Sequence, residues 1–294
     1  MPPKTVIITG CSSGIGLATA LKLARDQAQY KVYATMRNLD KRSDLEEKSG
    51  ELLNKTIFVR ELDVTNKTTI SAVVNEVIEK DKKIDIIVNN AGIGNFGVLE
   101  KTSMDTIRLV FETNFLGTVA LTRAVVPYMK KQSSGCIINM SSQAGFMGYP
   151  FNDAYCGSKF AIEGFSESLA PVLKLHNIDV CLIEPGFVST NFVANAMALN
   201  VVNGEAATTV GDVVPDDTVS QQQYDTFFTN IFKETTEIMQ TAEEVADVIH
   251  SVLVSENKHL RYQTSEYTKK AAQLKMRDTT GDEMVTIMKK YFDV

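Results

Sequence analysis

The sequence contains few of the residues that build metal centres and disulfide frameworks. Its 294 residues include only three histidines and four cysteines, and the cysteines are widely spaced with no C-x-x-C pair: Cys11, Cys136, Cys156 and Cys181. Zinc sites need paired Cys or His ligands, and disulfide frameworks need closely patterned cysteines. We therefore expect no metal site, and we predict that the four thiols are small buried side chains in a reducing compartment.

Long hydrophobic runs are also absent. The chain opens on Met1-Pro2-Pro3-Lys4 and passes into a short apolar segment, residues 6–8, and no stretch of 18 apolar residues occurs. A membrane helix needs about 20 such residues, and the core of a secretion signal needs about 7–15. We expect no secretion signal, no transmembrane segment and a cytoplasmic location.

Positive charge is not in excess. Thirty Lys and Arg face 36 Asp and Glu, which gives a net charge of −6. Binding to a phosphate backbone requires a basic surface, so nucleic acid is not expected as a partner. The charge is unevenly distributed, with 21 basic and 20 acidic residues in 1–190 but 9 basic and 16 acidic residues in 191–294.

The first 190 residues alternate short β-branched runs with longer amphipathic segments. Strands are predicted at 5–9, 31–35, 56–61, 84–89, 135–141 and 178–184, with a possible last strand at 260–264. Near-continuous apolar strands indicate a parallel sheet that is covered on both faces. Helical spacing appears at 16–27, 103–131 and 152–176. The alternation predicts one doubly wound α/β domain, 1–294, with a seven-stranded, mostly parallel sheet and helices on both faces.

The rhythm changes after residue 190. Residues 203–217 are rich in Gly, Thr and Asp and predict a mobile loop, and a helix is predicted at 221–237. Thr241 with Glu244 three residues later predicts a capping box at the start of the next helix. The tail, 265–294, has the pattern of an amphipathic helix.

A glycine-rich turn follows the first predicted strand, with the sequence Thr9-Gly10-Cys11-Ser12-Ser13-Gly14-Ile15-Gly16. Glycines permit a tight turn and a close approach of the backbone to a pyrophosphate, and the following helix offers free N–H groups. A turn between a strand and a helix in the first βαβ unit predicts a dinucleotide site. Its contacts are expected from Gly10, Ser12, Ser13, Gly14, Ile15 and Gly16.

The end of the second predicted strand indicates which nicotinamide cofactor binds. An NAD site places a carboxylate there, to hydrogen-bond the ribose 2′-hydroxyl. The sequence instead has Arg37, 21 residues after Gly16. A guanidinium suits a 2′-phosphate through forked charge-assisted hydrogen bonds, and Ser12 offers a second donor. We therefore predict NADP(H) as the cofactor.

A second set of polar residues is suited to hydride chemistry. Tyr155 and Lys159 are four residues apart on one predicted helix, so they share a face. Hydride transfer to a carbonyl leaves an alkoxide that needs a proton, and a free phenol, with a pKa of about 10, is a poor acid–base group. The Lys159 ammonium is expected to lower the pKa of Tyr155. Ser142 and Asn114 lie upstream.

Together with Asn89-Asn90-Ala91-Gly92 and Pro185-Gly186, these motifs resemble the short-chain dehydrogenase/reductase family over essentially the whole chain. The resemblance implies that Lys159 also holds the nicotinamide ribose, that Ser142 donates to the substrate oxygen, and that Asn114 holds a water linking Lys159 to solvent. It further implies cofactor contacts to the adenine, the cofactor floor and the carboxamide, with transfer of the pro-S hydride, from Asp63, Val64, Asn90, Ala91, Gly92, Pro185, Gly186, Val188 and Thr190.

Within the family, segments 32–37, 150–156 and 285–288 are most similar to the 17β-hydroxysteroid dehydrogenase and retinol dehydrogenase branch. This implies a small lipophilic steroid or retinoid substrate, a substrate lid at 191–240 and a homodimer formed through the two long helices. The alternatives are a reductase of prostaglandins or xenobiotic ketones and quinones, and a non-catalytic NADPH-sensing protein, which typically loses the Tyr or Lys. The candidate substrate contacts are Ser142, Phe146, Tyr149, Tyr155, Phe187, Phe192, Phe227 and Phe228.

Overall fold

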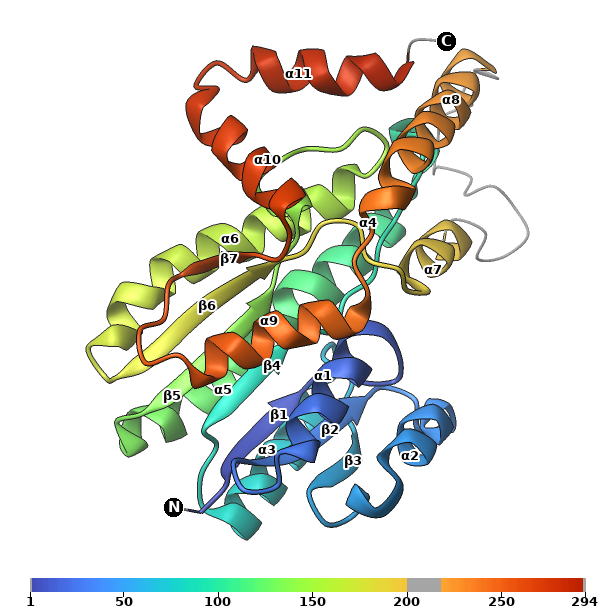
Figure 1. Ribbon diagram of the computed structural model, residues 1–294. Helices are drawn as coiled ribbons and strands as arrows, with labels where there is room; N and C mark the ends of the chain where they lie inside the picture. The colour runs from blue at the N-terminus through green and yellow to red at the C-terminus, as the bar shows by residue number, and fades with distance from the viewer. Residues whose placement is uncertain (1, 200–217, 293–294) are drawn as a thin grey trace.

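A seven-stranded sheet, all of it parallel, forms the centre of the computed structural model, which describes residues 2–199 and 218–292 (Figure 1). The predicted loop 203–217 lies outside these residues. The strands are β1 (Lys4–Ile8), β2 (Tyr30–Met36), β3 (Ile57–Glu61), β4 (Ile86–Asn89), β5 (Gly135–Met140), β6 (Ile178–Glu184) and β7 (Arg261–Gln263). The predicted doubly wound fold is confirmed, including the short last strand.

Helices cover both faces of the sheet. They are α1 (Gly14–Arg25), α2 (Ser43–Ser49), α3 (Lys67–Asp81), α4 (Met104–Phe111), α5 (Gly117–Gln132), α6 (Asp153–Lys174), α7 (Phe192–Leu199), α8 (Thr218–Thr235), α9 (Ala242–Val254), α10 (Glu266–Arg277) and α11 (Asp282–Lys289). Helices α2, α3 and α7 were not predicted from the sequence. A capping box of Thr241 and Glu244 opens α9, as predicted.

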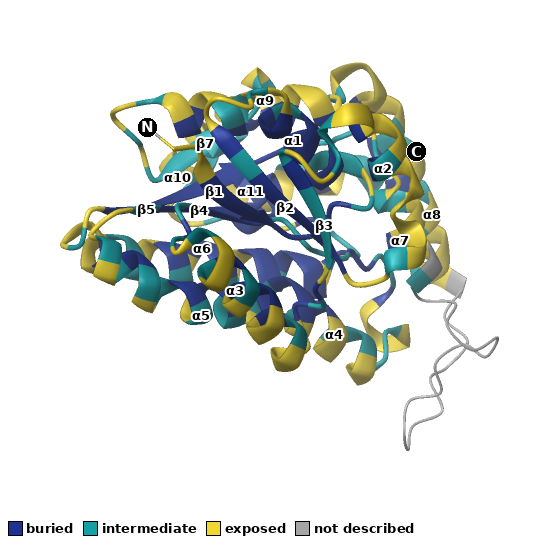
Figure 2. Ribbon diagram, turned by 90° about the horizontal axis from the view of Figure 1, so that it is seen from below, coloured by how far each residue is buried: buried dark blue, intermediate teal, exposed yellow. Residues whose placement is uncertain are grey.

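Alternation along each strand divides the core into two layers. On β1, Val6 and Ile8 belong to the cluster that packs beneath α1 and α9, whereas Ile7 belongs to the cluster beneath α3, α5 and α6. Figure 2 shows these two helical layers on opposite sides of the buried strands. Burial on both faces explains why the strands are almost continuously apolar.

The strand order, β3-β2-β1-β4-β5-β6-β7, determines where a ligand site forms. The chain runs outward from β1 to β3 and then returns to β4 on the other side of β1. Connections therefore leave the carboxyl ends of β1 and β4 in opposite directions and open a crevice between them. The glycine turn and the Asn89-Asn90-Ala91-Gly92 segment follow these two strands.

The predicted helix at 103–131 is confirmed as one helical run, Met104–Gln132, which contains one irregular turn. Residues Glu112–Leu116 form a π-helical segment between α4 and α5. The whole run, Met104–Gln132, is long and apolar enough to cross a membrane by length and composition, with a mean hydropathy of 1.3 over an 18-residue window. Its inner face packs in the core through Leu121, Val125 and Met129, as a core helix does. The absence of a transmembrane segment stays a prediction.

The C-terminal helices α7, α8, α10 and α11 lie beyond the carboxyl edge of the sheet (Figure 1). The tail is helical, as predicted, and consists of two helices: the chain turns between α10 and α11, where Gly281 takes a positive φ of 85° and its N–H donates to Asp278 Oδ1 at 2.9 Å. The helices bury a third cluster, which contains Phe227, Phe228, Met284 and Met288. This cluster is separate from the two layers that sandwich the sheet.

Candidate active site

A cavity of about 870 Å³ opens at the carboxyl edge of the sheet. Nearly every predicted cofactor residue lines it: Gly10, Ser12, Ser13, Gly14, Ile15, Arg37, Asp63, Val64, Asn90, Ala91, Gly92, Tyr155, Lys159, Pro185, Gly186, Val188 and Thr190. Of the predicted cofactor residues, Gly16 is not one of the described residues that line the cavity. The structure thus brings residues from all along the first 190 positions to one cavity.

The glycine turn is shaped so that larger residues do not fit. Gly10 and Gly14 have φ values of +72° and +57°, and a Cβ on Gly16 would lie 2.3 Å from the Gly10 carbonyl oxygen. Asn90 Nδ2 donates to the carbonyl oxygens of Thr9, at 2.8 Å, and Gly10, at 3.2 Å. Because α1 begins at Gly14, its first N–H groups face the same cavity, and the turn fits the pyrophosphate of a dinucleotide.

Two cations stand where the second strand ends. Arg37 follows the last residue of β2, and Lys41 lies in the short helical turn Leu39–Lys41; both line the cavity. Their side chains make no hydrogen bond or ion pair with any described residue, whereas the nearby Asp44 is paired with Lys48 at 3.1 Å. Lys41 was not predicted as a cofactor residue. The only sequence signal for it is its position four residues after Arg37.

Tyr155 and Lys159 lie on the first turns of α6, and both are buried. Lys159 Nζ is 5.6 Å from the centroid of the Tyr155 ring and donates to the Met140 carbonyl oxygen at 2.7 Å. That contact fixes the amine at the carboxyl end of β5. The pair therefore projects from one helix face into the cavity, as the four-residue spacing predicts.

The expected effect of Lys159 on Tyr155 is not what the structure shows. Burial raises the pKa of Tyr155, and the nearby Ser142 hydroxyl opposes this only in part. Burial also lowers the pKa of Lys159 to about 8, because desolvation disfavours the ammonium. The prediction of a lowered phenol pKa is therefore wrong for this structure, since removal from water disfavours the charged phenolate.

The carboxylate nearest to this pair belongs to a buried ion network. Glu163, one helical turn after Lys159, counteracts the drop in the lysine pKa. Its Oε2 accepts from Arg261 Nε at 3.1 Å, and the same Nε lies 3.3 Å from Glu184 Oε1. Burial raises the pKa of Glu184 to about 7. Glu167, on the exposed side, lies 3.4 Å from Arg261 NH2.

Ser142 is held by its neighbours on both sides. Ser141 N donates to Ile183 O, and Gln143 N donates to Pro185 O, each at 2.8 Å. Ser142 Oγ accepts from Ala144 N at 3.1 Å. These bonds tie the turn after β5 to the end of β6, so the Ser142 hydroxyl has a fixed place in the cavity wall.

Asn114 lies behind the cavity wall and is not one of its lining residues. Its Oδ1 accepts from Ile93 N at 2.8 Å, and its Nδ2 donates to Ile93 O and Ser158 Oγ, each at 2.9 Å. The side chain therefore ties the segment after β4 to α6. Asn114 is in the π-helical segment, and such irregular turns often occur at functional sites. Its predicted water stays a prediction.

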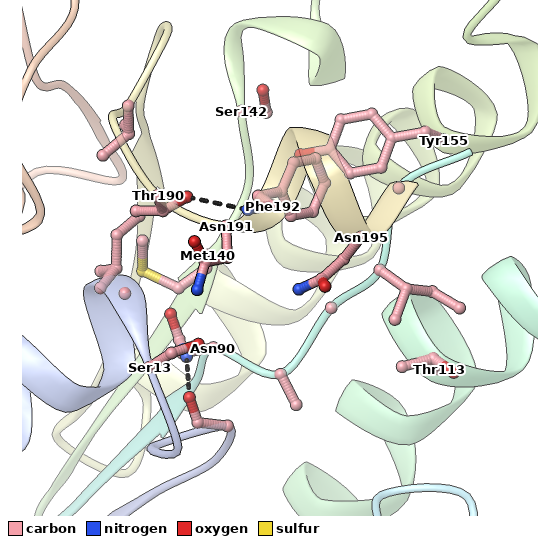
Figure 3. Close-up of a pocket in the computed structure, with 18 of the residues that line it drawn as sticks. Ser13, Asn90, Thr113, Met140, Ser142, Tyr155, Thr190, Asn191, Phe192 and Asn195 are labelled. Atoms are coloured by element: carbon pink, nitrogen blue, oxygen red, sulfur yellow. Dashed lines mark hydrogen bonds between the residues drawn. The ribbon is translucent and has the colours of Figure 1, made fainter. Parts of the chain in front are cut away.

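Helix α7 closes one side of the cavity. The Phe192 ring packs on Tyr155 with their centroids 5.3 Å apart, and Asn191 and Asn195 point into the same space (Figure 3). The side chains of Tyr149 and Phe187 complete the aromatic wall, 6.1 Å apart.

Three predicted substrate contacts lie elsewhere. Phe146, Phe227 and Phe228 are not among the described residues that line the cavity, and they pack instead in the third core cluster. Phe227 contacts the rings of Phe151 and Phe292, at 5.8 and 5.4 Å. The helical spacing that suggested a substrate wall reflects packing among α8, the end of the tail and the turn before α6.

Several polar lining residues were missed by the sequence reading. They are Asn38, Asp44, Thr113, Ser141, Gln143, Asn152, Asn191 and Asn195. Ser141 and Gln143 flank Ser142, and Asn152 lies in the segment 150–156 that resembles the dehydrogenase branch. The others carry no such sequence signal.

Residues 4–199 match the family model described as short chain dehydrogenase. The chain is 38% identical over 285 residues to retinol dehydrogenase 8 of Bos taurus, covering 95% of this chain and 87% of that protein. It is 36% identical over 300 residues to 17-beta-hydroxysteroid dehydrogenase type 1 of Homo sapiens, covering 98% and 85%. The crystal structure of a short-chain dehydrogenase from Streptomyces avermitilis superimposes with a TM-score of 0.75 at 26% identity, covering 98% of this chain and 99% of that one.

Proposed function

Since this chain belongs to the short-chain dehydrogenase/reductase family of oxidoreductases, we propose that it interconverts a hydroxyl group and a keto or aldehyde group on a lipophilic steroid or retinoid, using NADP(H). The observation that carries the proposal is the single cavity in which the glycine turn, Ser142, Tyr155 and Lys159 meet an aromatic wall. The similarity to a retinol dehydrogenase and a hydroxysteroid dehydrogenase supports the substrate class.

The residues supply proton transfer and positioning. NADP(H), when bound, supplies or accepts the hydride. In reduction, the Tyr155 hydroxyl donates its proton to the substrate oxygen, and in oxidation the phenolate takes it back. Ser142 donates a hydrogen bond to the same oxygen, and Lys159, as an ammonium, stabilises the phenolate that forms.

The choice of NADP(H) rests on Arg37 and Lys41. Their unpaired side chains line the cavity, and no acid stands at the carboxyl end of β2 to accept a ribose hydroxyl. A 2′-phosphate placed there gains charge-assisted hydrogen bonds from the guanidinium.

The test is turnover by the purified protein with NADPH and a ketone or aldehyde panel. The panel holds estrone, androstenedione, all-trans-retinal, a prostaglandin ketone and a quinone. Reduction of a steroid or retinal with the highest kcat/KM supports the proposal. A preference for the prostaglandin or quinone would replace the substrate class, and tight NADPH binding without any turnover would favour a cofactor-sensing protein.

A homodimer and a cytoplasmic location are part of the same proposal. The outer surfaces of the α4–α5 run and of α6 expose large apolar side chains: Leu109, Leu116, Phe160, Val172 and Leu175. Pairing these surfaces would remove them from water. Light scattering that gives twice the 32.4 kDa chain mass supports the dimer, and a monomer mass contradicts it.

A further inference from the structure

Two primary amides in the cavity wall have side chains that bond no residue in the part of the chain that the structure describes. Gln143 is 4% exposed and Asn152 is 6% exposed, and both line the cavity. The amide oxygen of each is buried without a partner, and the amide nitrogen of each bonds no other described residue. Buried polar groups are normally satisfied, and one that is not calls for an explanation.

Both amides are close to the reacting groups along the chain. Gln143 follows Ser142 directly, so their Cα atoms are about 3.8 Å apart. Asn152 occupies the N-cap position of α6, three residues before Tyr155, and lines the same cavity. Gln143 also reaches the loop after β6, where its Oε1 would lie 3.4 Å from a Cβ on Gly186.

Neither amide side chain is needed to hold the local backbone. Gln143 N is held by Pro185 O, so the side chain is not needed to hold the turn. Asn152 occupies the N-cap position of α6 but makes no side-chain capping bond there. Neither side chain therefore does the structural work that would account for its burial.

We infer that Gln143 and Asn152 bind a second, uncharged hydrogen-bonding group of the substrate, a hydroxyl carried next to the reacting carbonyl carbon. This rests on the proposed function and narrows its substrate class to lipophilic ketones with a neighbouring polar group. An amide both donates and accepts, which matches a hydroxyl. The apolar remainder of the substrate lies against Tyr149, Phe187 and Phe192.

A carboxylate in this place is disfavoured by the charges around the cavity. The cations among the described lining residues are Arg37, Lys41 and Lys159. The first two stand at the β2 end of the cavity, and Lys159 is bound to Met140 O beside Tyr155. No cation is left among these lining residues to pair with an acid group beside the two amides.

The test compares matched substrates with the wild-type protein and NADPH. 2-Decanone, 1-hydroxy-2-decanone and 2-oxodecanoate share a chain length and differ beside the carbonyl. We expect kcat/KM for the hydroxyketone to exceed that for the plain ketone at least tenfold, mainly through KM, and the keto acid to be the poorest substrate. Gln143→Leu should reduce the tenfold ratio to near one, and Asn152→Leu should do the same.

Gln222→Leu is the matched control, because Gln222 is an exposed amide on α8 that does not line the cavity. Melting temperature and NADPH affinity, measured for each variant, separate a binding effect from misfolding. Should both Leu variants fail to fold, the wild-type substrate ratio decides. Equal kcat/KM for plain ketone and hydroxyketone, with turnover of steroids or retinal, overturns this inference and leaves the proposed function standing. Absence of all turnover overturns the proposed function as well.

Discussion

The two regions of this molecule are held together by different means. In residues 2–190, strand ends and backbone hydrogen bonds define the cofactor side of the cavity. Beyond residue 190, most of the described chain is helical and packs through aromatic rings, such as Tyr224 on Phe228 at 4.5 Å. The cofactor region carries almost balanced charge, and the substrate region carries 9 basic against 16 acidic residues. Backbone geometry therefore determines much of the first region and side-chain packing much of the second, whereas the aromatic wall of the cavity takes Tyr149 and Phe187 from the first and Phe192 from the second.

This difference explains why the cofactor side of the cavity contains recognisable sequence motifs and the substrate side does not. A turn that needs a positive φ or has no room for a Cβ accepts only glycine, so the requirement appears in the sequence itself. A wall of aromatic side chains can be built from many combinations of residues at many positions. The cofactor side consequently has motifs, and the substrate side has only composition.

The largest effect is expected where the two regions meet, at Tyr155. Tyr155→Phe removes the hydroxyl and keeps the ring that packs on Phe192. General acid–base catalysis contributes about 10²- to 10⁴-fold, so kcat/KM should fall by that factor. Steady-state kinetics measures the fall, and NADPH affinity should stay within about twofold of wild type. Full activity in this variant would show that another group transfers the proton.

In the cofactor region, the next largest effect is expected from the loss of the Arg37 side chain. Arg37→Ala should lower kcat/KM with NADPH about 10- to 100-fold, since hydrogen bonds to charged groups contribute about 1.5–3 kcal/mol. The value with NADH should change little, because a ribose hydroxyl carries no charge. Arg42→Ala is a control, because Arg42 is an exposed arginine that pairs with Glu46 and does not line the cavity. An unchanged preference for NADPH in Arg37→Ala would contradict the assigned phosphate contact.

How far the sequence predicts the structure follows the same division. The strands, the glycine turn and the Tyr155–Lys159 pair were predicted because their periodicity or spacing is local. The π-helical segment at Glu112–Leu116 was not, since it accompanies the bonds from Asn114 to Ile93 and Ser158, which are remote in sequence. Phe227 was misplaced for a similar reason, because helical spacing alone cannot tell which of two apolar faces lines a cavity. The raised pKa of Tyr155 depends on burial, which only the packed structure shows.

The buried ion network predicts a change in pH dependence of moderate size. Lys159 has a pKa lowered to about 8, and Glu163 opposes that lowering. Activity that needs the ammonium is present below this pKa and is lost as the pH rises through it. Glu163→Gln removes the opposing charge, so the pKa falls further, and the loss should begin about one pH unit lower.

The pH profile of kcat/KM measures this shift. Arg261, Glu167 and Glu184 are the other charged groups of the network. Glu167→Gln removes an exposed carboxylate from the same arginine and should leave the profile in place. A Glu163→Gln profile that matches wild type would show that the network does not influence Lys159.

The smallest effect is expected from the aromatic packing of the substrate region. Phe227 is 1% exposed and contacts four other rings, those of Phe151, Phe228, Tyr291 and Phe292. Phe227→Leu should lower the free energy of unfolding by about 1–3 kcal/mol, because a buried ring loses both volume and edge-to-face contacts. Phe58→Leu in the cofactor region is the matched change, since Phe58 is half-buried and stacks on the single ring of Tyr33. Thermal unfolding should therefore show the larger loss for Phe227, with NADPH affinity preserved in both variants. An equal or larger loss for Phe58 would mean that ring packing supports the cofactor region at least as much, and the comparison would then fail.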